Sequence, residues 1–245
     1  MNASIYSFNH KNFSFLHGFA YIISTNVSSY YILDTNESLI LKFNDNWEYV
    51  GNMNVSSPNY MISVNNEHLF ITSDEGIIKM NVDLDLIQTY NSLAYIGICY
   101  NETNNTFMVV SNLLKQIDIF NLNLTIVDTI SLSKYSPWSI EKNNNKLYVG
   151  TITSEILVIE NKVILQKLEI CMGVTSFINS ILIDQYDYMA VVCGAEDVLH
   201  LYYTNGSWVG ISWVVYSTPE YIGYDSNGRF VFIMTNELRT FQQNF

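Results

Sequence analysis

The strongest constraint on the fold is a repeat that three prolines mark. Pro58, Pro137 and Pro219 are 79 and 82 residues apart, each separation close to twice 40. Each stands in a similar phrase, in which an aromatic residue follows within two positions and an alternating apolar stretch begins. Because proline has no backbone N–H, a sheet tolerates it at the first residue of a strand. The spacing therefore predicts a structural unit of about 40 residues, with a strand that begins near each proline.

Within that period the chain repeats a phrase of four short strands. The runs are rich in β-branched and aromatic residues, and none shows a sustained period of 3.6. First strands are expected at 20–24, 60–64, 95–100, 138–141, 177–183 and 221–225, and second strands at 30–33, 68–72, 107–110, 146–150, 188–193 and 230–234. Third strands are expected at 39–43, 116–120, 155–159 and 198–202, and fourth strands near Trp47, Leu86, Thr125, Val163 and Trp208.

Six such phrases predict an all-β fold, a six-bladed β-propeller whose blades are four-stranded antiparallel meanders of about 41 residues. One blade cannot bury both of its faces alone, so each blade would stack on its neighbours. We expect a single domain over residues 1–245, with blades at roughly 19–54, 55–91, 92–131, 132–172, 173–214 and 215–245 plus 3–16.

The last phrase ends at Phe245 after its third strand and lacks a fourth. Residues 12–16 match a fourth strand, so we expect them to complete the blade that begins at Tyr221 and to remove an exposed edge. Both 4–8 and 238–242 have the pattern of a third strand, which leaves two alternatives open. One end of the chain flanks the ring, or the N-terminal strands of one chain complete the open blade of another.

The phrase Asn-Asn-Lys-Leu-Tyr-Val-Gly at 144–150, followed by Glu-Ile-Leu-Val-Ile at 155–159, resembles NHL- and YVTN-type β-propeller repeats. Residues 219–233 are similar in layout, although the chain lacks the Asn-His-Leu signature. The resemblance implies a propeller fold. It does not imply one function, because NHL-like propellers serve protein binding, RNA binding, lyase chemistry and extracellular adhesion.

The charge balance argues against the RNA-binding class. Eleven Lys and Arg stand against 23 Asp and Glu, a formal charge of −12, and no basic cluster is present. Such a chain would be repelled by a nucleic-acid backbone. No apolar run approaches the ~18 residues of a membrane span. The first residues show no signal peptide, so the chain is either cytosolic or the mature part of a longer secreted one.

Nine Asn-x-Ser/Thr sequons favour the secreted alternative. One is Asn2, and the eight predicted glycosylation sites are Asn12, Asn26, Asn36, Asn54, Asn101, Asn104, Asn123 and Asn205. All eight fall in expected turns or at their edges. Six of them lie between first and second or third and fourth strands, which places them on one face of a propeller, whereas Asn36 and Asn54 fall on the opposite face. We expect partner contact on the face of Asn36 and Asn54.

The three cysteines form no CxxC motif and have no histidine at metal-ligand spacing, which argues against zinc and thioredoxin-type sites. Cys171 precedes the first strand of its blade and Cys193 ends the second strand. Antiparallel pairing brings these two positions together, so a Cys171–Cys193 disulfide is expected; the alternative is two buried thiols. Cys99 is expected to be an inert core thiol.

No catalytic motif is present, and we expect no catalytic residue, no bound metal and no cofactor. The histidines at 10, 17, 68 and 200 are scattered. The aromatic residues Trp138, Tyr21, Tyr60, Tyr95 and Tyr221 suit inter-blade packing better than a sugar-binding channel mouth. The pairs Asp74-Glu75 and Glu196-Asp197 suit a solvated acidic rim better than a weak calcium site.

These features predict a non-enzymatic extracellular glycoprotein β-propeller. Its role would be protein interaction, adhesion or self-assembly, with a protein partner or a second copy of itself. Two alternatives remain: a propeller hydrolase or lyase with a site at the channel mouth, and a cytosolic protein-binding propeller in which the sequons are accidental.

Overall fold

The computed structural model describes residues 3–6, 16–23, 28–92, 94–171, 176–194, 198–214, 219–224, 230–234 and 237–241, and every regular element within them is a β-strand. The chain divides into two compact units. Unit 1 comprises Met1–Ser92 and Glu220–Phe245, and unit 2 comprises Leu93–Pro219. No helix in the described part of the chain is long and apolar enough to cross a membrane.

The strands of unit 1 come from both ends of the chain. They are β1 (Ala3–Tyr6), β2 (Leu16–Ile23), β3 (Ser28–Asp34), β4 (Leu39–Asn44), β5 (Tyr49–Asn54), β6 (Pro58–Val64), β7 (His68–Ser73), β8 (Gly76–Asn81), β9 (Leu86–Asn91), β22 (Pro219–Tyr224), β23 (Phe230–Met234) and β24 (Glu237–Phe241).

The strands of unit 2 are consecutive in the chain. They are β10 (Ile98–Asn101), β11 (Thr106–Ser111), β12 (Gln116–Asn121), β13 (Ile126–Ser131), β14 (Pro137–Asn143), β15 (Lys146–Thr151), β16 (Glu155–Glu160), β17 (Val163–Glu169), β18 (Ile178–Ile183), β19 (Tyr188–Cys193), β20 (Val198–Tyr203) and β21 (Trp208–Val214).

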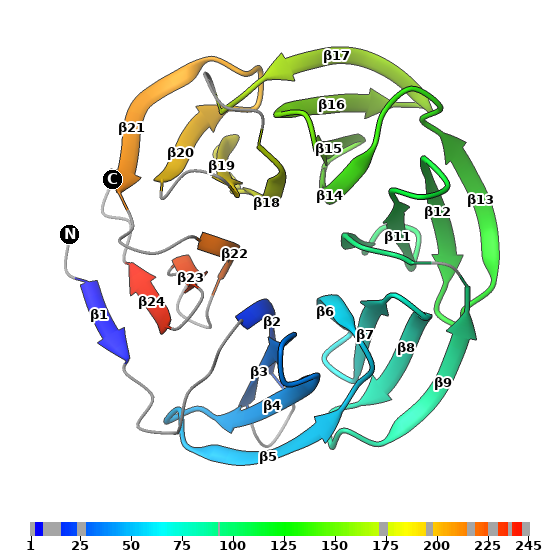
Figure 1. Ribbon diagram of the computed structural model, residues 1–245, viewed down its shortest axis with the longest axis vertical. Helices are drawn as coiled ribbons and strands as arrows, with labels where there is room; N and C mark the ends of the chain where they lie inside the picture. Colours follow the sequence, from blue (N-terminus) through cyan, green and yellow to red (C-terminus); the bar gives the residue numbers. More distant parts are fainter. Residues whose placement is uncertain are drawn as a thin grey trace. The chain divides into compact units, whose positions relative to one another are not determined.

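Five sheets are meanders of four consecutive strands, and we call these sheets blades. They are β2-β3-β4-β5 and β6-β7-β8-β9 in unit 1, and β10-β11-β12-β13, β14-β15-β16-β17 and β18-β19-β20-β21 in unit 2 (Figure 1). Within each blade the second and third strands pair antiparallel. Four-stranded antiparallel blades were predicted correctly, but the described strands form five such blades instead of the expected six.

The remaining four described strands form a sheet of different origin, in the order β1-β24-β23-β22. Ala3 pairs with Phe241 and Tyr6 with Leu238, so β1 covers the open edge of β24. The expectation that residues 12–16 complete this sheet is therefore wrong. Leu16 already begins β2, and residues 12–15 lie outside the described residues. Many short alternating strands can pair with an open sheet edge. The sequence pattern did not distinguish between residues 12–16 and β1 as the strand that pairs with β24.

The prolines begin strands, as predicted. Pro58, Pro137 and Pro219 are the first residues of β6, β14 and β22. In β6 and β14 the register shifts immediately after the proline, between Pro58 and Tyr60 and between Pro137 and Ser139. A proline contributes no N–H to the ladder, so the first residues of these strands can bulge without losing a hydrogen bond.

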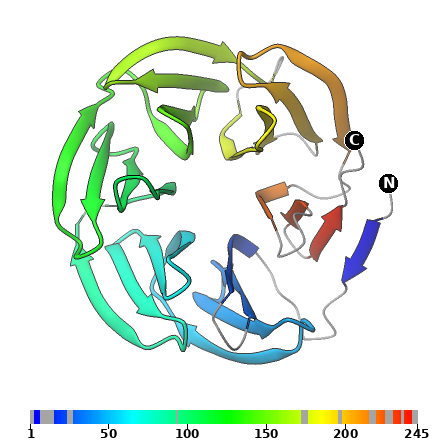
Figure 2. The same cartoon turned by 180° about the vertical axis from the view of Figure 1, so that it is seen from behind.

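The second strand of each described blade forms the centre of the core. In β7, β11 and β19 every residue after the first is buried, and β15 has the same pattern. A strand that is buried on both faces loses the alternation of a half-exposed strand, which explains runs such as Phe107–Val110. Fourth strands such as β9 and β17 are mostly exposed, and both views of the ribbon show them at the outer end of their blades (Figures 1 and 2).

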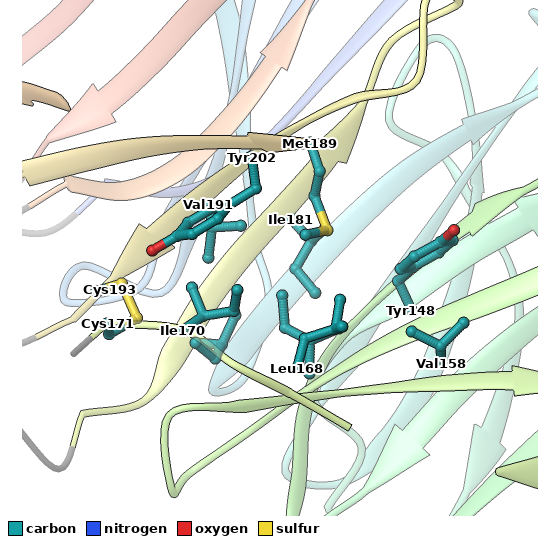
Figure 3. Close-up of a cluster of buried hydrophobic side chains, with 12 residues drawn as sticks. Tyr148, Val158, Leu168, Ile170, Cys171, Ile181, Met189, Val191, Cys193 and Tyr202 are labelled. Atoms are coloured by element: carbon teal, nitrogen blue, oxygen red, sulfur yellow. A yellow bond between two sulfur atoms is a disulfide. The ribbon is translucent and has the colours of Figure 1, made fainter. Parts of the chain in front are cut away.

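Neighbouring blades pack face to face within each unit. In unit 2 the β14 blade and the β18 blade share a cluster of twelve buried residues, including Tyr148, Leu168, Ile181 and Met189 (Figure 3). In unit 1 the β2 and β6 blades share a second cluster, around Tyr31, Ile71 and Met80. Each blade thus supplies the apolar surface that its neighbour needs.

One carboxylate is buried within the β10 blade. Asp118 on β12 is 1% exposed. It accepts hydrogen bonds from the Tyr95 hydroxyl at 2.7 Å, from Gln116 Nε2 at 2.8 and 2.9 Å, and from the Thr129 hydroxyl at 2.8 Å. These donors compensate the cost of taking the group out of water, and they link β12 to β13 and to the segment before β10.

We predict that Asp118→Ala lowers the free energy of unfolding by about 2–3 kcal/mol, because the buried Tyr95 hydroxyl loses its acceptor. Chemical denaturation measures the change. The matched control is Asp128→Ala on the adjacent strand, where an exposed ion pair with Lys162 at 2.6 Å is lost and little change is expected. Equal effects of the two changes would contradict the structural role of Asp118.

Candidate functional site

The two edges of unit 2 differ in what they carry. Chain direction alternates along each meander, so the turns after first and third strands lie at one edge, and those after second and fourth strands lie at the other. Hydrogen bonds between blades confirm this arrangement. At the first edge Asn143 Nδ2 donates to Asp187 Oδ1 at 2.8 Å, and at the second edge Ser154 N donates to the Ser176 carbonyl at 3.0 Å.

All four sequons of unit 2 lie at the first edge, which we call the sequon edge. Asn104, Asn123 and Asn205 are exposed turn residues, and Asn101 is half-buried at the end of β10. In unit 1, Asn36 and Asn54 are exposed and lie at the other kind of edge, in the β3–β4 turn and at the end of β5. Asn12 and Asn26 lie outside the described residues. Each of the six described sites thus lies in a turn or at the end of a strand, while the sharing of one face by sites of both units and their glycosylation stay predictions.

The opposite edge of unit 2, which we call the sequon-free edge, exposes large apolar side chains. Leu113 and Leu114 in the β11–β12 turn are 64% and 42% exposed, and Phe177 before β18 is 47% exposed. Phe177 stacks on Trp138 of β14, with ring centroids 5.0 Å apart and an interplanar angle of 23°. An exposed aromatic ring supported by a second ring is a typical anchor for a protein partner.

The backbone around Phe177 is held from both sides. The Phe177 carbonyl accepts a hydrogen bond from Gly194 N at 2.9 Å. On its other side Ser176 N donates to Ser154 Oγ at 2.8 Å, and Ser154 N and Oγ both donate to the Ser176 carbonyl at 3.0 Å. Phe177 is therefore anchored to the β15–β16 turn and to the end of β19, which limits the entropy that binding would cost.

The Cys171–Cys193 disulfide adds a covalent link at the same edge. It joins the beginning of the connection after β17 to the last residue of β19, with the Cα atoms 6.1 Å apart, and its sulfur atoms are visible beside Ile170 (Figure 3). The disulfide predicted from the sequence is present. Cys193 directly precedes Gly194, whose N–H binds the Phe177 carbonyl, so the disulfide restrains the segment that holds Phe177.

A perturbed carboxyl group lies on β14. Strand alternation places Glu141 on the same face as Ser139 and Asn143, which bind the Ile178 carbonyl and Asp187 in the β18 blade. Burial raises the pKa of Glu141 from 4.5 to about 8, and a backbone hydrogen bond and the charge of Lys142 offset only part of that shift. The residue as a whole is only partly buried, so it is the carboxyl end that has lost contact with water. Most of the Glu141 population is therefore protonated at neutral pH.

Cys99 on β10 is a free, buried thiol. Burial raises its pKa well above the ordinary value, and the charge of Glu141 acts in the same direction. The thiol therefore stays protonated and is a poor nucleophile. This agrees with the prediction of an inert core residue.

The aromatic residues singled out in the sequence have different surroundings. Tyr95 is 1% exposed and donates to Asp118, so it is a packing residue. Tyr60 and Tyr221 lie 6.2 Å apart in unit 1. Trp138 supports an exposed ring, that of Phe177. The side chain of Tyr21 lies outside the described set.

The acidic pairs show no metal geometry in the described part of the chain. Asp74 accepts a hydrogen bond from Asn59 Nδ2 at 3.1 Å, and Glu75 accepts one from Ser56 Oγ at 2.8 Å. No group of three or more His, Cys, Asp or Glu side chains is placed to hold a metal ion among the described residues. Glu196 and Asp197 lie outside them, as do His10 and the side chain of His17. Burial lowers the pKa of His68, and His200 lies within β20.

Sequence reasoning missed Phe177 and Glu141. Phe177 looked like the start of a strand, and its exposure depends on how Ser176 and Gly194 hold the connection. Glu141 lies in a polar stretch that looks solvated, and the burial of its carboxyl group arises only in the folded chain. No local signal distinguishes either residue.

Comparison with known proteins identifies the class of fold. A streptogramin B lyase structure is similar over 98% of this chain and 96% of that chain, with a TM-score of 0.72 and 9% identity. A catalytically inactive virginiamycin B lyase from Staphylococcus aureus, solved with quinupristin, has a TM-score of 0.73 and 12% identity over 98% and 99% of the two chains. The WD40 β-propeller domain of Doa1 has a TM-score of 0.71 and 14% identity over 94% and 79%.

These likenesses define the chain as an all-β propeller with four-stranded antiparallel blades. At such low identity they establish the fold alone. No family model and no curated protein matches the sequence, so membership of the NHL or YVTN type stays a prediction.

The raised pKa of Glu141 predicts a pH dependence of stability. The folded state holds the proton up to about pH 8, whereas the unfolded state releases it near 4.5. The folded state therefore binds more protons between these values, and stability falls as pH rises through this window. We expect denaturation midpoints to decrease from pH 5 to pH 8 in the wild type and to decrease less in Glu141→Gln. Parallel profiles for the two proteins would contradict the assignment.

Proposed function

We propose that this protein is a non-enzymatic, protein-binding β-propeller of the secretory pathway, and that unit 2 binds its partner through the sequon-free edge. The observation that carries the proposal is the exposed ring of Phe177 stacked on Trp138. This ring lies at the edge of unit 2 where no sequon stands, and its backbone is fixed before any partner arrives.

The energetics of protein interfaces support this assignment. A few buried aromatic anchors supply most of the binding free energy in typical interfaces. Leu113 and Leu114 add apolar surface at the same edge. Lys115 and Lys134 lie in turns there as well, so the edge is not uniformly acidic despite the formal charge of −12.

The secretory route is supported by covalent chemistry. Structural disulfides persist in oxidising compartments and are rare in reducing ones. The Cys171–Cys193 disulfide joins residues 22 positions apart. Five of the described sequon asparagines are exposed, so an oligosaccharide could extend into solvent without displacing a strand. No cofactor is part of the proposal.

The sheet β1-β24-β23-β22 of unit 1 has the same number of strands as the five blades, and β24 pairs antiparallel with both β1 and β23. The self-assembly form of the hypothesis is supported by exposed apolar residues at the start of fourth strands, among them Val127, Leu165 and Trp208.

The proposed secretory route is tested by measuring the intact mass of the native protein before and after release of N-glycans, and again after reduction of disulfides. We expect several glycan increments to be lost on release and a gain of about two daltons on reduction of one disulfide. A mass equal to that of the bare chain would contradict the secretory route and favour a cytosolic binding propeller with accidental sequons.

The binding edge is tested with Phe177→Ala. We expect the Kd for a partner to rise at least tenfold, about 1.4 kcal/mol, because the anchor ring is lost. The matched control is Tyr186→Ala, which removes a 68% exposed aromatic side chain from the sequon edge and should leave the Kd unchanged. Partners captured by the wild type are measured by calorimetry, and sedimentation velocity tests a second copy. Retained binding in Phe177→Ala, or equal loss in Tyr186→Ala, would contradict the proposal.

A lyase is the second candidate, because two of the solved structures that share this fold are lyases, although the likeness itself establishes only the fold. Quinupristin, the molecule in one of these structures, is a direct probe. Conversion of quinupristin by the purified protein, followed by mass spectrometry, would support the lyase. An unchanged substrate together with the Phe177 effect would support the binding propeller.

A further inference from the structure

Among the described residues, the β20–β21 turn has the same backbone as three other turns that join a third strand to a fourth. Tyr203 N donates to the Ser207 carbonyl at 2.9 Å, and Gly206 N donates to the Tyr203 carbonyl at 2.8 Å, with Gly206 at a φ of +87°. The turns that begin at Asn44, Asn81 and Asn121 show the same pair of hydrogen bonds and a residue with positive φ at the fourth position. All four join a third strand to a fourth.

The first residue of the turn differs. In the other three turns an asparagine Oδ1 caps the backbone by accepting N–H groups two and four residues ahead. Asn121 Oδ1, for example, binds the N–H groups of Asn123 and Thr125 at 3.0 Å each. In the β20–β21 turn this position is Tyr203, which cannot cap. The β20–β21 turn therefore lacks those two cap hydrogen bonds and has an aromatic ring at that position instead. The ring does not stabilise the backbone of the turn as the asparagine does, so its role depends on other contacts.

The sequon Asn205-Gly206-Ser207 stands beside that ring. Ser207 Oγ donates to Asn205 Oδ1 at 2.7 Å, and Ser207 N donates to the same oxygen at 2.9 Å, so these two side chains are in contact. Tyr203 and Ser207 face each other across the turn, and opposite residues of a hairpin point their side chains to the same face. Tyr203, Asn205 and Ser207 therefore share one face.

The ring of Tyr203 is partly exposed to solvent. Tyr203 is 41% exposed, and its contact with Tyr188, at 5.2 Å between ring centroids, covers only part of it. Asn205 Nδ2, the atom that would carry a glycan, has no hydrogen-bond partner among the described residues. The first sugar of an N-glycan is held within a few bonds of this nitrogen, and its C–H face is apolar and suits stacking on an aromatic ring.

We propose that Asn205 carries an N-glycan whose first N-acetylglucosamine stacks on Tyr203, so that the glycan is a structural part of the β20–β21 turn. The inference rests on the secretory route of the proposed function and specifies one site of modification and its contact. The sequon at Asn123 has the same turn but lacks the ring, because Asn121 occupies the position of Tyr203. The glycan at Asn123 would therefore contribute less to stability.

The experiment uses the full chain secreted from a eukaryotic host behind an added signal peptide, with glycans trimmed to one N-acetylglucosamine. Thermal unfolding is compared for the wild type, Asn205→Gln, Tyr203→Thr and the double variant, and glycopeptide mass spectrometry reports occupancy. We expect Asn205→Gln to lower Tm by about 2–4 °C when Tyr203 is present, the shift that a contact of this size gives in a domain of this length. In the Tyr203→Thr background the same change should have little effect.

Three controls separate this contact from general destabilisation. Tyr203→Phe keeps the ring and should preserve the effect of the glycan. Trp208→Thr removes another exposed aromatic side chain near the turn and should leave the effect unchanged. Asn121→Tyr should give the glycan at Asn123 a stabilising effect that it lacks in the wild type.

An unoccupied Asn205 in the secreted chain, or an equal Tm loss on Asn205→Gln with and without Tyr203, would overturn the inference. A failure of the proposed secretory route can be distinguished from a failure of this inference. If the native protein carries no glycan, the proposed function is wrong, whereas the coupling between Tyr203 and the sugar is still measured in the secreted chain.

Discussion

The structure depends on packing between blades, because each blade is apolar on both faces. Strands such as β11 and β19 are buried throughout after their first residue and cannot satisfy both faces within one sheet. The clusters shared by adjacent blades supply the missing contacts. Buried apolar area is the dominant stabilising term in folding, so stacking of successive blades is a condition of stability for this chain.

This constraint also decides where function can lie. The faces of the blades are used for packing, and the fourth strands retain one exposed side, which leaves the turns at the two edges as the adaptable surface. In unit 2 the edges have diverged. One carries the four sequons, and the other carries the disulfide, Phe177 and two exposed leucines. The two edges can differ in this way because the turns at the two ends of a meander do not share side chains.

The turns also show how a repeat acquires a local role. Three turns between third and fourth strands are closed by an asparagine cap, which is a local solution to unpaired N–H groups. Where the cap is replaced by Tyr203, the backbone path is unchanged, because glycine at the fourth position adopts the positive φ without strain. The first residue of such a turn can therefore differ between blades while the backbone of the turn stays the same.

Much of the fold could be predicted from the sequence, since apolar runs and their turns are local. The prolines marked strand starts and the runs marked the blades. The position of Cys171 before the first strand of its blade, and of Cys193 at the end of the second strand, indicated their bond. The strand that covers β24 was decided only by the tertiary structure, because several segments near the N-terminus alternate well enough to pair with an open edge. The exposure of Phe177 and the raised pKa of Glu141 were likewise decided by neighbouring blades. Burial and desolvation depend on what packs against a residue, and that is a property of the assembled sheets, not of the order of residues.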